Sequence, residues 1–522
     1  MKLRKSFTTL WCVCLAVLII GAGCSQQKPD PQDCNTVERQ AITEPNYAQA
    51  TLPPNIAPIN FVVREKGSAY YVHIRSQAGK PIDIFSRSGT IDIPIKAWRN
   101  LLKANLNQVL YTDVYVQDDR GSWTRFAAME NRIAPEPIDP YVAYRIIPPL
   151  FMYYDEMGLY QRDLTSFNER PILLNRGVTD SCINCHSFQD YNPDRMLFHI
   201  RIGAVGTCMI LTYDGRVEKV DTKTAFNGPT SYRSWHPNGR TVAFAFNTVR
   251  QVFHSTGKNI DVFDRASDLV IYDVKDKTLT TSPKISGPER MESLPEWSPD
   301  GKYIYFCSGP SMESVASQEL FYTEMKYDLM RISYDVDKDI WGEVEPVIKA
   351  SEMDKSIAHP KISPDGKYLL FCMSDCTYFP LYRPESDLYL MDMQTGQFHK
   401  AENINSNRAE SYHCWSSNGR WIIFSSKRQD SQSTHLYIAY FDRDGHFSKP
   451  FLLPQQDPEY ESSRPIVYNI PEFIKGPVNI SQQKLIQAAW SKKMVKTKLD
   501  PKISGQPRQE GKEIPYESGW RN

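Results

Sequence analysis

The sequence predicts an all-β protein: a β-propeller preceded by a small β-sandwich-like domain. Four segments repeat one pattern, in which Trp or Ile precedes a turn that ends in Gly and a basic residue, and three apolar residues follow shortly after. The turn glycines are Gly239, Gly301, Gly366 and Gly419, so the repeats lie 62, 65 and 53 residues apart. Asn-Gly and Asp-Gly supply the positive φ of a tight hairpin. A four-stranded sheet repeated at such a period is typical of a propeller.

The N-terminus has the features of a lipoprotein signal. A basic start is followed by an apolar run over residues 10–20 and by Gly21-Ala22-Gly23-Cys24. We expect residues 1–23 to be a signal peptide, Cys24 to be acylated (palmitate), and residues 24–58 to be a tether. No Asp follows Cys24, so the expected location is the outer membrane facing the periplasm, or the cell surface. The alternative is an ordinary cleaved signal or a membrane anchor.

Residues 59–135 are expected to form the small β-sandwich-like domain. Short alternating strands are predicted at residues 61–63, 70–74 and 111–116. One helix is expected where Ile95, Trp98, Leu101 and Leu102 share a face. This domain shows no catalytic set in its sequence.

Residues 136–204 are expected to be a connector that carries the chemistry. Cys182-Ile183-Asn184-Cys185-His186 is a C-x-x-C-H run, the attachment signature for a c-type haem. The two thiols add to the haem vinyl groups, and His186 becomes an axial ligand of the iron. Half a zinc site or a redox dithiol is the alternative. No second C-x-x-C exists and the flanks do not suggest a βαβ unit, so we expect one covalent haem c, bound by Cys182, Cys185 and His186.

The second axial position of the iron has two nearby candidates, Met196 and His199. Side chains three residues apart on a strand point to opposite faces of the sheet, so at most one of them serves easily. A ligand from elsewhere, or an open face, stays possible. A closed six-coordinate iron transfers electrons, whereas an open one binds small ligands.

Residues 205–460 are expected to be the propeller, with six blades favoured over five or seven. Residues 461–522 are expected to be a tail with one amphipathic helix that carries Leu485, Ile486, Ala489 and Trp490. Residues just upstream of the hairpins, among them Glu296, His359 and His413, should gather near one mouth of the central channel. They form either a site or a set of side chains that satisfy one another around water.

The Trp/Ile-Ser-Pro-Asp-Gly-Lys repeats resemble those of the TolB-like propeller family. The order of lipobox, β-module, Cys-x-x-Cys-His-Ser-Phe segment and propeller resembles bacterial lipoproteins with a single c-type haem motif. The resemblance covers nearly the whole chain and implies an envelope propeller that docks protein partners. TolB itself has no haem, so the motif at residues 182–186 departs from it. Some TolB-like propellers are lyases that bind metal in the channel through histidines, which would involve His359 and His413.

The charge balance and the absent motifs exclude several classes. Lys plus Arg equals Asp plus Glu at 61 each, which gives no electrostatic reason to expect nucleic acid. No Gly-x-Ser-x-Gly, His-Glu-x-x-His or phosphate-binding glycine loop occurs, so a common hydrolase is not supported. The first hypothesis is one-electron transfer to a docked redox or envelope partner. The alternatives are a haem-free interaction or assembly module and an enzyme of the propeller channel that resembles a carbohydrate lyase.

Overall fold

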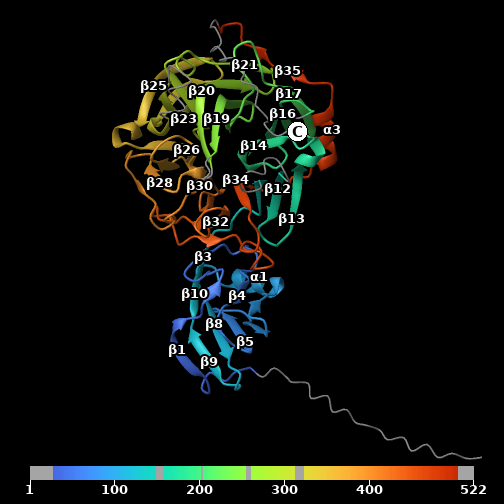
Figure 1. The fold of residues 1–522 in the computed structure, drawn as a ribbon, viewed down its shortest axis with the longest axis vertical. Coiled ribbons are helices and arrows are strands. Elements are labelled where there is room, and N and C mark those ends of the chain that lie inside the picture. The colour runs from blue at the N-terminus through green and yellow to red at the C-terminus, as the bar shows by residue number, and fades with distance from the viewer. Residues whose placement is uncertain (1–27, 148–156, 202–203, 254–259, 312–321, 504–522) are drawn as a thin grey trace, which may run out of the picture.

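The computed structural model describes residues 28–147, 157–201, 204–253, 260–311 and 322–503. The chain folds into two parts, an N-terminal β-domain and a larger propeller above it in Figure 1. The two parts touch directly, because Asn60 Nδ2 donates to the carbonyl of Gln456 at 2.9 Å and Lys449 Nζ to that of Ala48 at 2.8 Å. The expected all-β propeller class is confirmed.

The N-terminal domain contains two sheets and one helix. The larger sheet contains β1 (Asn35–Gln40), β3 (Thr51–Leu52), β5 (Ala69–Arg75), β6 (Ile82–Ser86), β8 (Val109–Gln117), β9 (Trp123–Ala127) and β10 (Met129–Ile133). The smaller contains β2 (Thr43–Glu44), β4 (Phe61–Val63) and β7 (Thr90–Ile91). The helix α1 (Ile95–Ala104) buries Trp98, Leu101 and Leu102, the face that the sequence indicates.

The expected tether over 24–58 differs from the structure, since from residue 28 this segment belongs to the domain. Tyr47, Leu52 and Ile56 are buried in its core, and β1 pairs in parallel with β9. The strands are short and their apolar residues are few, so the sequence carried no clear alternation there. The signal peptide 1–23 and Cys24 lie outside the described residues.

In the described part of the chain, six sheets each contain four antiparallel strands, which we number as blades 1 to 6. Named from the innermost strand outward, blade 1 consists of β34 (Val467–Ile474), β11 (Tyr141–Ile147), β12 (Gly158–Asp163) and β13 (Glu169–Leu174), and blade 2 of β14 (Cys182–Phe188), β15 (Met196–Arg201), β16 (Cys208–Tyr213) and β17 (Arg216–Asp221). Blade 3 consists of β18 (Arg233–Trp235), β19 (Thr241–Phe253), β20 (Ile260–Asp273) and β21 (Thr278–Thr280), and blade 4 of β22 (Arg290–Trp297), β23 (Tyr303–Pro310), β24 (Asp328–Asp335) and β25 (Ile340–Ile348). Blade 5 consists of β26 (Ser356–Ile362), β27 (Tyr368–Ser374), β28 (Asp387–Asp392) and β29 (Phe398–Lys400), and blade 6 of β30 (Glu410–Trp415), β31 (Trp421–Ser426), β32 (His435–Tyr440) and β33 (Phe451–Leu452).

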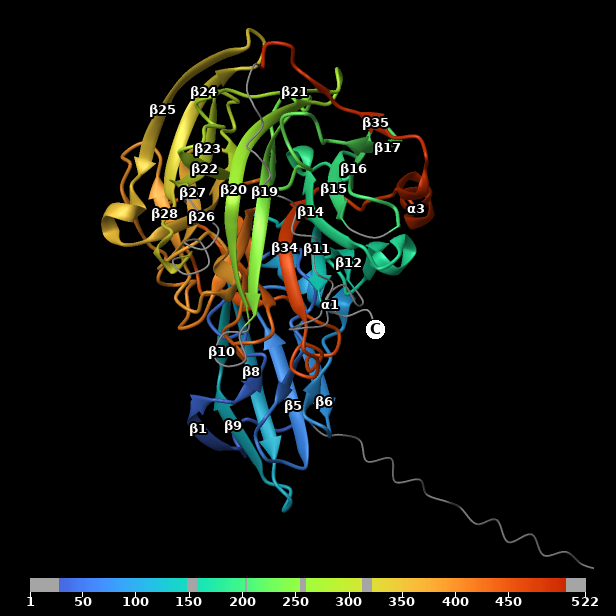
Figure 2. The same cartoon turned by 45° about the horizontal axis from the view of Figure 1, so that its top comes forward.

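The propeller begins earlier and ends later than the expected 205–460. The supposed connector 136–204 supplies β11 to β15, and the supposed tail 461–522 supplies β34. Figure 2 shows β34 beside β11, and Tyr141 pairs with Ile474. The ring of blades is therefore closed by pairing one strand from each end of the propeller segment. No local sequence pattern predicts this pairing.

The segment that follows β34 in the sequence lies along the outer edge of blades 2 and 3. The predicted helix is α3 (Gln482–Trp490), which buries Leu485 and Ala489, and Ser481 caps its N-terminus. Two short strands follow and pair in parallel with β17 and β21, namely β35 (Val495–Lys496) and β36 (Lys498–Leu499). Neither helix of the described ranges has the length and apolar character needed to cross a bilayer. Short 3-10 helices lie in connections: η1 (Asn175–Val178), η2 (Gln189–Tyr191), η3 (Tyr322–Glu324), η4 (Ala350–Met353) and η5 (Pro380–Tyr382).

Candidate functional site at the propeller axis

Five of the innermost strands carry the same irregularity. In β14, β22, β26, β30 and β34, two residues lie opposite one residue of the next strand. The first residue of each bulge has a positive φ: Cys185, Leu294, His359, Tyr412 and Ile470. A bulge re-aims the side chains of a strand. The second half of the C-x-x-C-H run, Cys185-His186, is therefore the bulge of β14 and lies at the propeller axis.

The three residues of the haem motif are buried. Cys182, Cys185 and His186 expose 8%, 2% and 1% of their surface, and both thiols are free. Cys182 packs in the apolar cluster that also holds Met157 and Val178, and burial raises the pKa of its thiol.

His186 stands out because neither ring nitrogen has a hydrogen-bond partner of acceptable geometry among the described residues. The pKa of His186 lies well below its ordinary value, first because of burial and then because of the charges of Arg233 and Arg145. Backbone groups of Ala143 and Ile470 lie near enough to oppose this shift in part, without completing a hydrogen bond.

This donor set fits a c-type haem in its chemistry. The group needs two free thiols and an imidazole whose ligating nitrogen is not already committed to a hydrogen bond. Cys182 and Cys185 are free, and His186 follows them on the same strand with both nitrogens unpartnered. A buried polar group without a partner costs free energy, which a metal bond would offset.

The two candidates for the distal position lie on different sides of blade 2. Met196 is buried in the apolar cluster shared with blade 1, and Phe188 of that cluster contacts the ring of His186 at a centroid distance of 6.1 Å. His199 instead packs against Phe244 of blade 3, and its Nε2 lies 3.0 Å from Thr230 Oγ1. His186 faces Ala143 of blade 1, so Met196 shares its side and His199 does not.

A cavity of about 470 Å³ lies on the axis, lined by residues of the innermost strands of all six blades. It brings together Glu296, His359 and His413, the three channel residues that the sequence indicates. His413 Nε2 lies 2.9 Å from the Leu370 carbonyl, and burial lowers its pKa to about 3. The ring of His359 packs on Tyr412 at 4.5 Å, and its Nε2 is unpartnered in the described structure.

Polar contacts at one level of this cavity come from Ser234 of β18 and from the residues after four of the five bulges, namely Ser187, Glu296, Lys361 and Glu472. Glu296 Oε2 accepts from Lys361 Nζ at 2.6 Å and from Ser234 Oγ at 3.2 Å. On the other side, Glu472 Oε1 accepts from the backbone N–H of Phe188 at 2.8 Å and from Ser187 Oγ at 3.2 Å. Burial raises the pKa of Glu472 despite the nearby positive charge of Arg233.

Sequence reasoning missed Glu472 because it assigned this residue to the tail. A signal was present: Pro471-Glu472-Phe473 repeats the Pro-Glu-aromatic pattern of Pro295-Glu296-Trp297. In the described ranges, no group of three or more His, Cys, Asp or Glu side chains is arranged to hold a metal ion.

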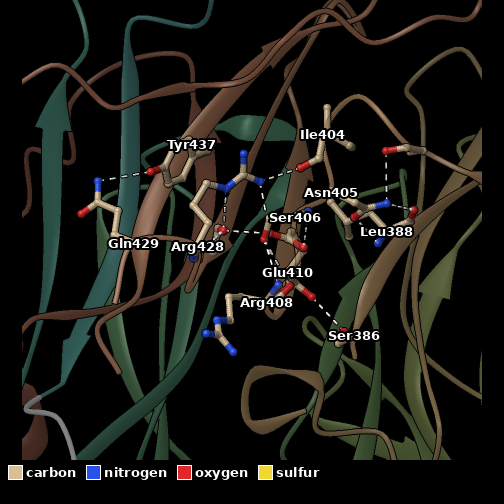
Figure 3. A network of polar contacts seen from close by, with 12 residues as sticks. Ser386, Leu388, Ile404, Asn405, Ser406, Arg408, Glu410, Arg428, Gln429 and Tyr437 are labelled. Carbon is tan, nitrogen blue, oxygen red and sulfur yellow. Dashed lines mark hydrogen bonds and ion pairs between the residues drawn. The ribbon is translucent and has the colours of Figure 1, made fainter. Parts of the chain in front are cut away.

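A second buried carboxylate, Glu410, belongs to the scaffold and not to the site. Figure 3 shows its network. Oε1 accepts from Arg428 at 3.1 Å, from Ser426 at 2.8 Å and from Ser406 Oγ at 2.7 Å, and Oε2 from Ser406 N at 3.1 Å. Because both oxygens are occupied, this network holds β30 to β31 and to the preceding loop.

Solved structures with similar folds include TolB from Acinetobacter baumannii, at 14% identity and a TM-score of 0.40, with 70% of this chain and 79% of that chain covered. An oligogalacturonate lyase in complex with manganese is 12% identical at a TM-score of 0.31, with 78% and 99% covered. A periplasmic gluconolactonase from Pseudomonas aeruginosa is 12% identical at a TM-score of 0.31, and the match covers 63% of this chain and 99% of that chain. No protein-family model and no curated protein matches the chain. At these identities and TM-scores the likenesses carry no argument about this chain.

The strands and the site together define the class of this protein. It is an all-β propeller of six four-stranded blades in the described part of the chain, joined to an N-terminal β-domain. Its axis holds a cavity with both polar and apolar lining residues, and the C-x-x-C-H run ends in the bulge of one of the strands around that axis.

Proposed function

We propose that this chain is a lipid-anchored protein of the cell envelope that carries one covalent c-type haem on blade 2 and exchanges single electrons with a docked envelope partner. The observation that carries the proposal is His186, an imidazole exposed by 1% with no hydrogen-bond partner on either ring nitrogen among the described residues. Cys24 would carry the lipid, and the propeller would present the haem to the partner.

Cys182 and Cys185 would hold the haem, and His186 would be its axial ligand. A haem bound there supplies a one-electron iron couple. The surrounding residues exclude water from the ligand, because Cys185, His186 and Phe188 are all buried. The nearby positive charges of Arg145 and Arg233 favour the reduced iron, which carries one positive charge fewer.

The distal ligand is proposed to be Met196. It lies on the same side of blade 2 as His186, whereas His199 faces blade 3. A His/Met pair raises the reduction potential relative to two histidines. The Met196→Ala variant should therefore lower the potential and alter the visible spectrum, whereas His199→Ala should do neither.

The test is expression of the full chain in cells that attach c-type haem, followed by intact-mass measurement and a reduced-minus-oxidised spectrum. We expect one haem per chain in the wild type and none in the Cys182→Ala, Cys185→Ala double variant. Cys208→Ala is the matched control, since Cys208 is a free, buried cysteine of the same blade. Wild-type protein without haem mass, from cells that load another c-type cytochrome, would overturn the proposal.

A further inference from the structure

Arg233 lines the axial cavity without an ionic or hydrogen-bonded partner. No hydrogen bond or ion pair joins its guanidinium to another residue of the described structure. The residue is partly exposed, and of its three guanidinium nitrogens only Nε is buried without a partner. Burial is the main reason why the pKa of His186 and of His359 is low, and the positive charge of Arg233 adds to it. Burial raises the pKa of the Glu472 carboxyl, and the charge of Arg233 opposes that rise. A partly exposed guanidinium that has no carboxylate partner at a cavity wall is free to bind an anion that enters the cavity.

The other charges of the cavity are already satisfied. The Lys361 ammonium forms an ion pair with Glu296, with Nζ 2.6 Å from Oε2. The Glu472 carboxyl is held by Ser187 Oγ and by the backbone of Phe188, not by an arginine at ion-pair distance. Within the described lining, Arg233 is thus the cation that lacks a carboxylate.

The cavity wall also restricts which anion fits. A planar guanidinium binds a carboxylate through two parallel hydrogen bonds. Two carboxyl side chains of the lining, Glu296 on one side and Glu472 on the other, oppose a dianion such as phosphate but accept hydrogen bonds from hydroxyl or amino groups. Ser187 and Ser234 add hydroxyls at the same level. A volume of about 470 Å³ falls in the range of small-molecule sites.

We propose that the axial cavity binds a small organic monocarboxylate that also bears hydroxyl or amino donors, with its carboxylate on Arg233. The donors of the ligand face Glu296 and Glu472, and the rings of Tyr232 and Tyr412 flank the carbon skeleton. This site goes beyond the haem proposal and does not depend on it, because it rests on Arg233 and the residues after the bulges, not on the two thiols.

The test is binding to the full chain by isothermal titration and thermal shift at millimolar concentration. The probes are D-gluconate and L-serine, with D-sorbitol as the uncharged counterpart of gluconate and inorganic phosphate as the dianion. We expect gluconate or serine to bind, and sorbitol and phosphate to bind at least about tenfold more weakly, the factor that corresponds to 1.4 kcal/mol. The Cys182→Ala, Cys185→Ala variant should bind equally well, which separates this site from the haem.

Arg233→Gln should lose affinity by about tenfold or more, and Arg233→Lys should keep part of it because it retains the charge without the planar fork. Arg195→Gln is the matched control, since Arg195 pairs with Asp214 outside the cavity lining. If Arg233→Gln unfolds, two measurements still test the proposal. They are the affinity of Arg233→Lys and the comparison of gluconate with sorbitol. The proposal is wrong if neither carboxylate binds the wild type, if sorbitol binds as tightly as gluconate, or if a folded Arg233 variant binds like the wild type.

Discussion

The network around Glu410 and the cluster around His186 and Arg233 are two buried polar regions of one propeller. In the first, a carboxylate with 0% exposure is matched by Arg428 and two serines. In the second, both ring nitrogens of the buried His186 and the Nε of the partly exposed Arg233 have no partner among the described residues. Buried polar groups that serve only the fold are normally satisfied by the fold. The difference places Glu410 in the scaffold and motivates the two proposals for the axial cluster.

Glu410→Ala should have the largest effect, because it removes a fully buried carboxylate and leaves the partly buried Arg428 without its ionic partner. We expect a loss of about 3–5 kcal/mol in the free energy of unfolding, the usual cost of breaking a buried ion pair from one side. Urea unfolding followed by fluorescence measures it. A loss below about 1 kcal/mol would mean that this network does not hold the scaffold, and the contrast with the axial cluster would fail.

Asp264 is an intermediate case, because it is hydrogen-bonded but has no ion pair with any residue that the structure describes. Tyr378 donates to its Oδ1 and Asn247 Nδ2 donates to its Oδ2 at 2.7 Å, yet burial raises its pKa to about 7. The folded state thus holds this proton to higher pH than the unfolded state. Its contribution to stability is complete below the unfolded pKa near 4 and falls by about 1.4 kcal/mol per pH unit as the pH rises toward 7.

Thermal unfolding between pH 4 and pH 8 measures this dependence. Asp264→Asn should flatten the decline whatever its absolute stability, whereas Asp335→Asn, at an exposed aspartate, should leave the slope unchanged. An equal slope in wild type and Asp264→Asn would show that the carboxyl ionises freely in the folded protein.

The sequence could predict blades whose strands are linked by hairpins with a turn signature. Gly301 and Gly366 adopt positive φ at the expected turns, and the following strands β23 and β27 are buried. Blade 1 could not be predicted in this way. Its inner strand comes from residues 467–474 and its second strand from residues 141–147, so its pairing is a long-range event without a local pattern.

The candidate site divides along the same line. Glu296 and His359 precede recognisable turns, so their meeting at the axis could be expected, whereas Glu472 lies on the closing strand. The spacing of Cys182, Cys185 and His186 predicts a chemistry but not a conformation. Their place in a bulged innermost strand follows from pairing with β15, which depends on the whole sheet. Whether Arg233 has a carboxylate partner likewise depends on distances between blades, which the sequence does not give.

His186→Leu distinguishes a haem ligand from an unsatisfied core histidine. In chain prepared without haem, the substitution should stabilise the fold by about 1 kcal/mol, because it removes a buried polar group that has no partner. In haem-loaded chain it should remove the axial ligand and change the visible spectrum. His413→Leu is the matched control and should destabilise both forms, since it leaves the Leu370 carbonyl without its donor. Loss of stability in haem-free His186→Leu would show that this imidazole is satisfied after all.

The smallest effect is expected for a charged pair on the surface, Arg331 and Glu345. Their side chains are 37% and 50% exposed and lie 2.7 Å apart, closer than Arg428 and Glu410. Because water screens an exposed pair, Glu345→Gln should change the free energy of unfolding by less than about 1 kcal/mol, and added salt should reduce even that. Urea unfolding at low and high salt measures both values. If Glu345→Gln cost as much as Glu410→Ala, contact distance and not burial would govern these ion pairs, and an unpaired charge at the axis would no longer imply a ligand.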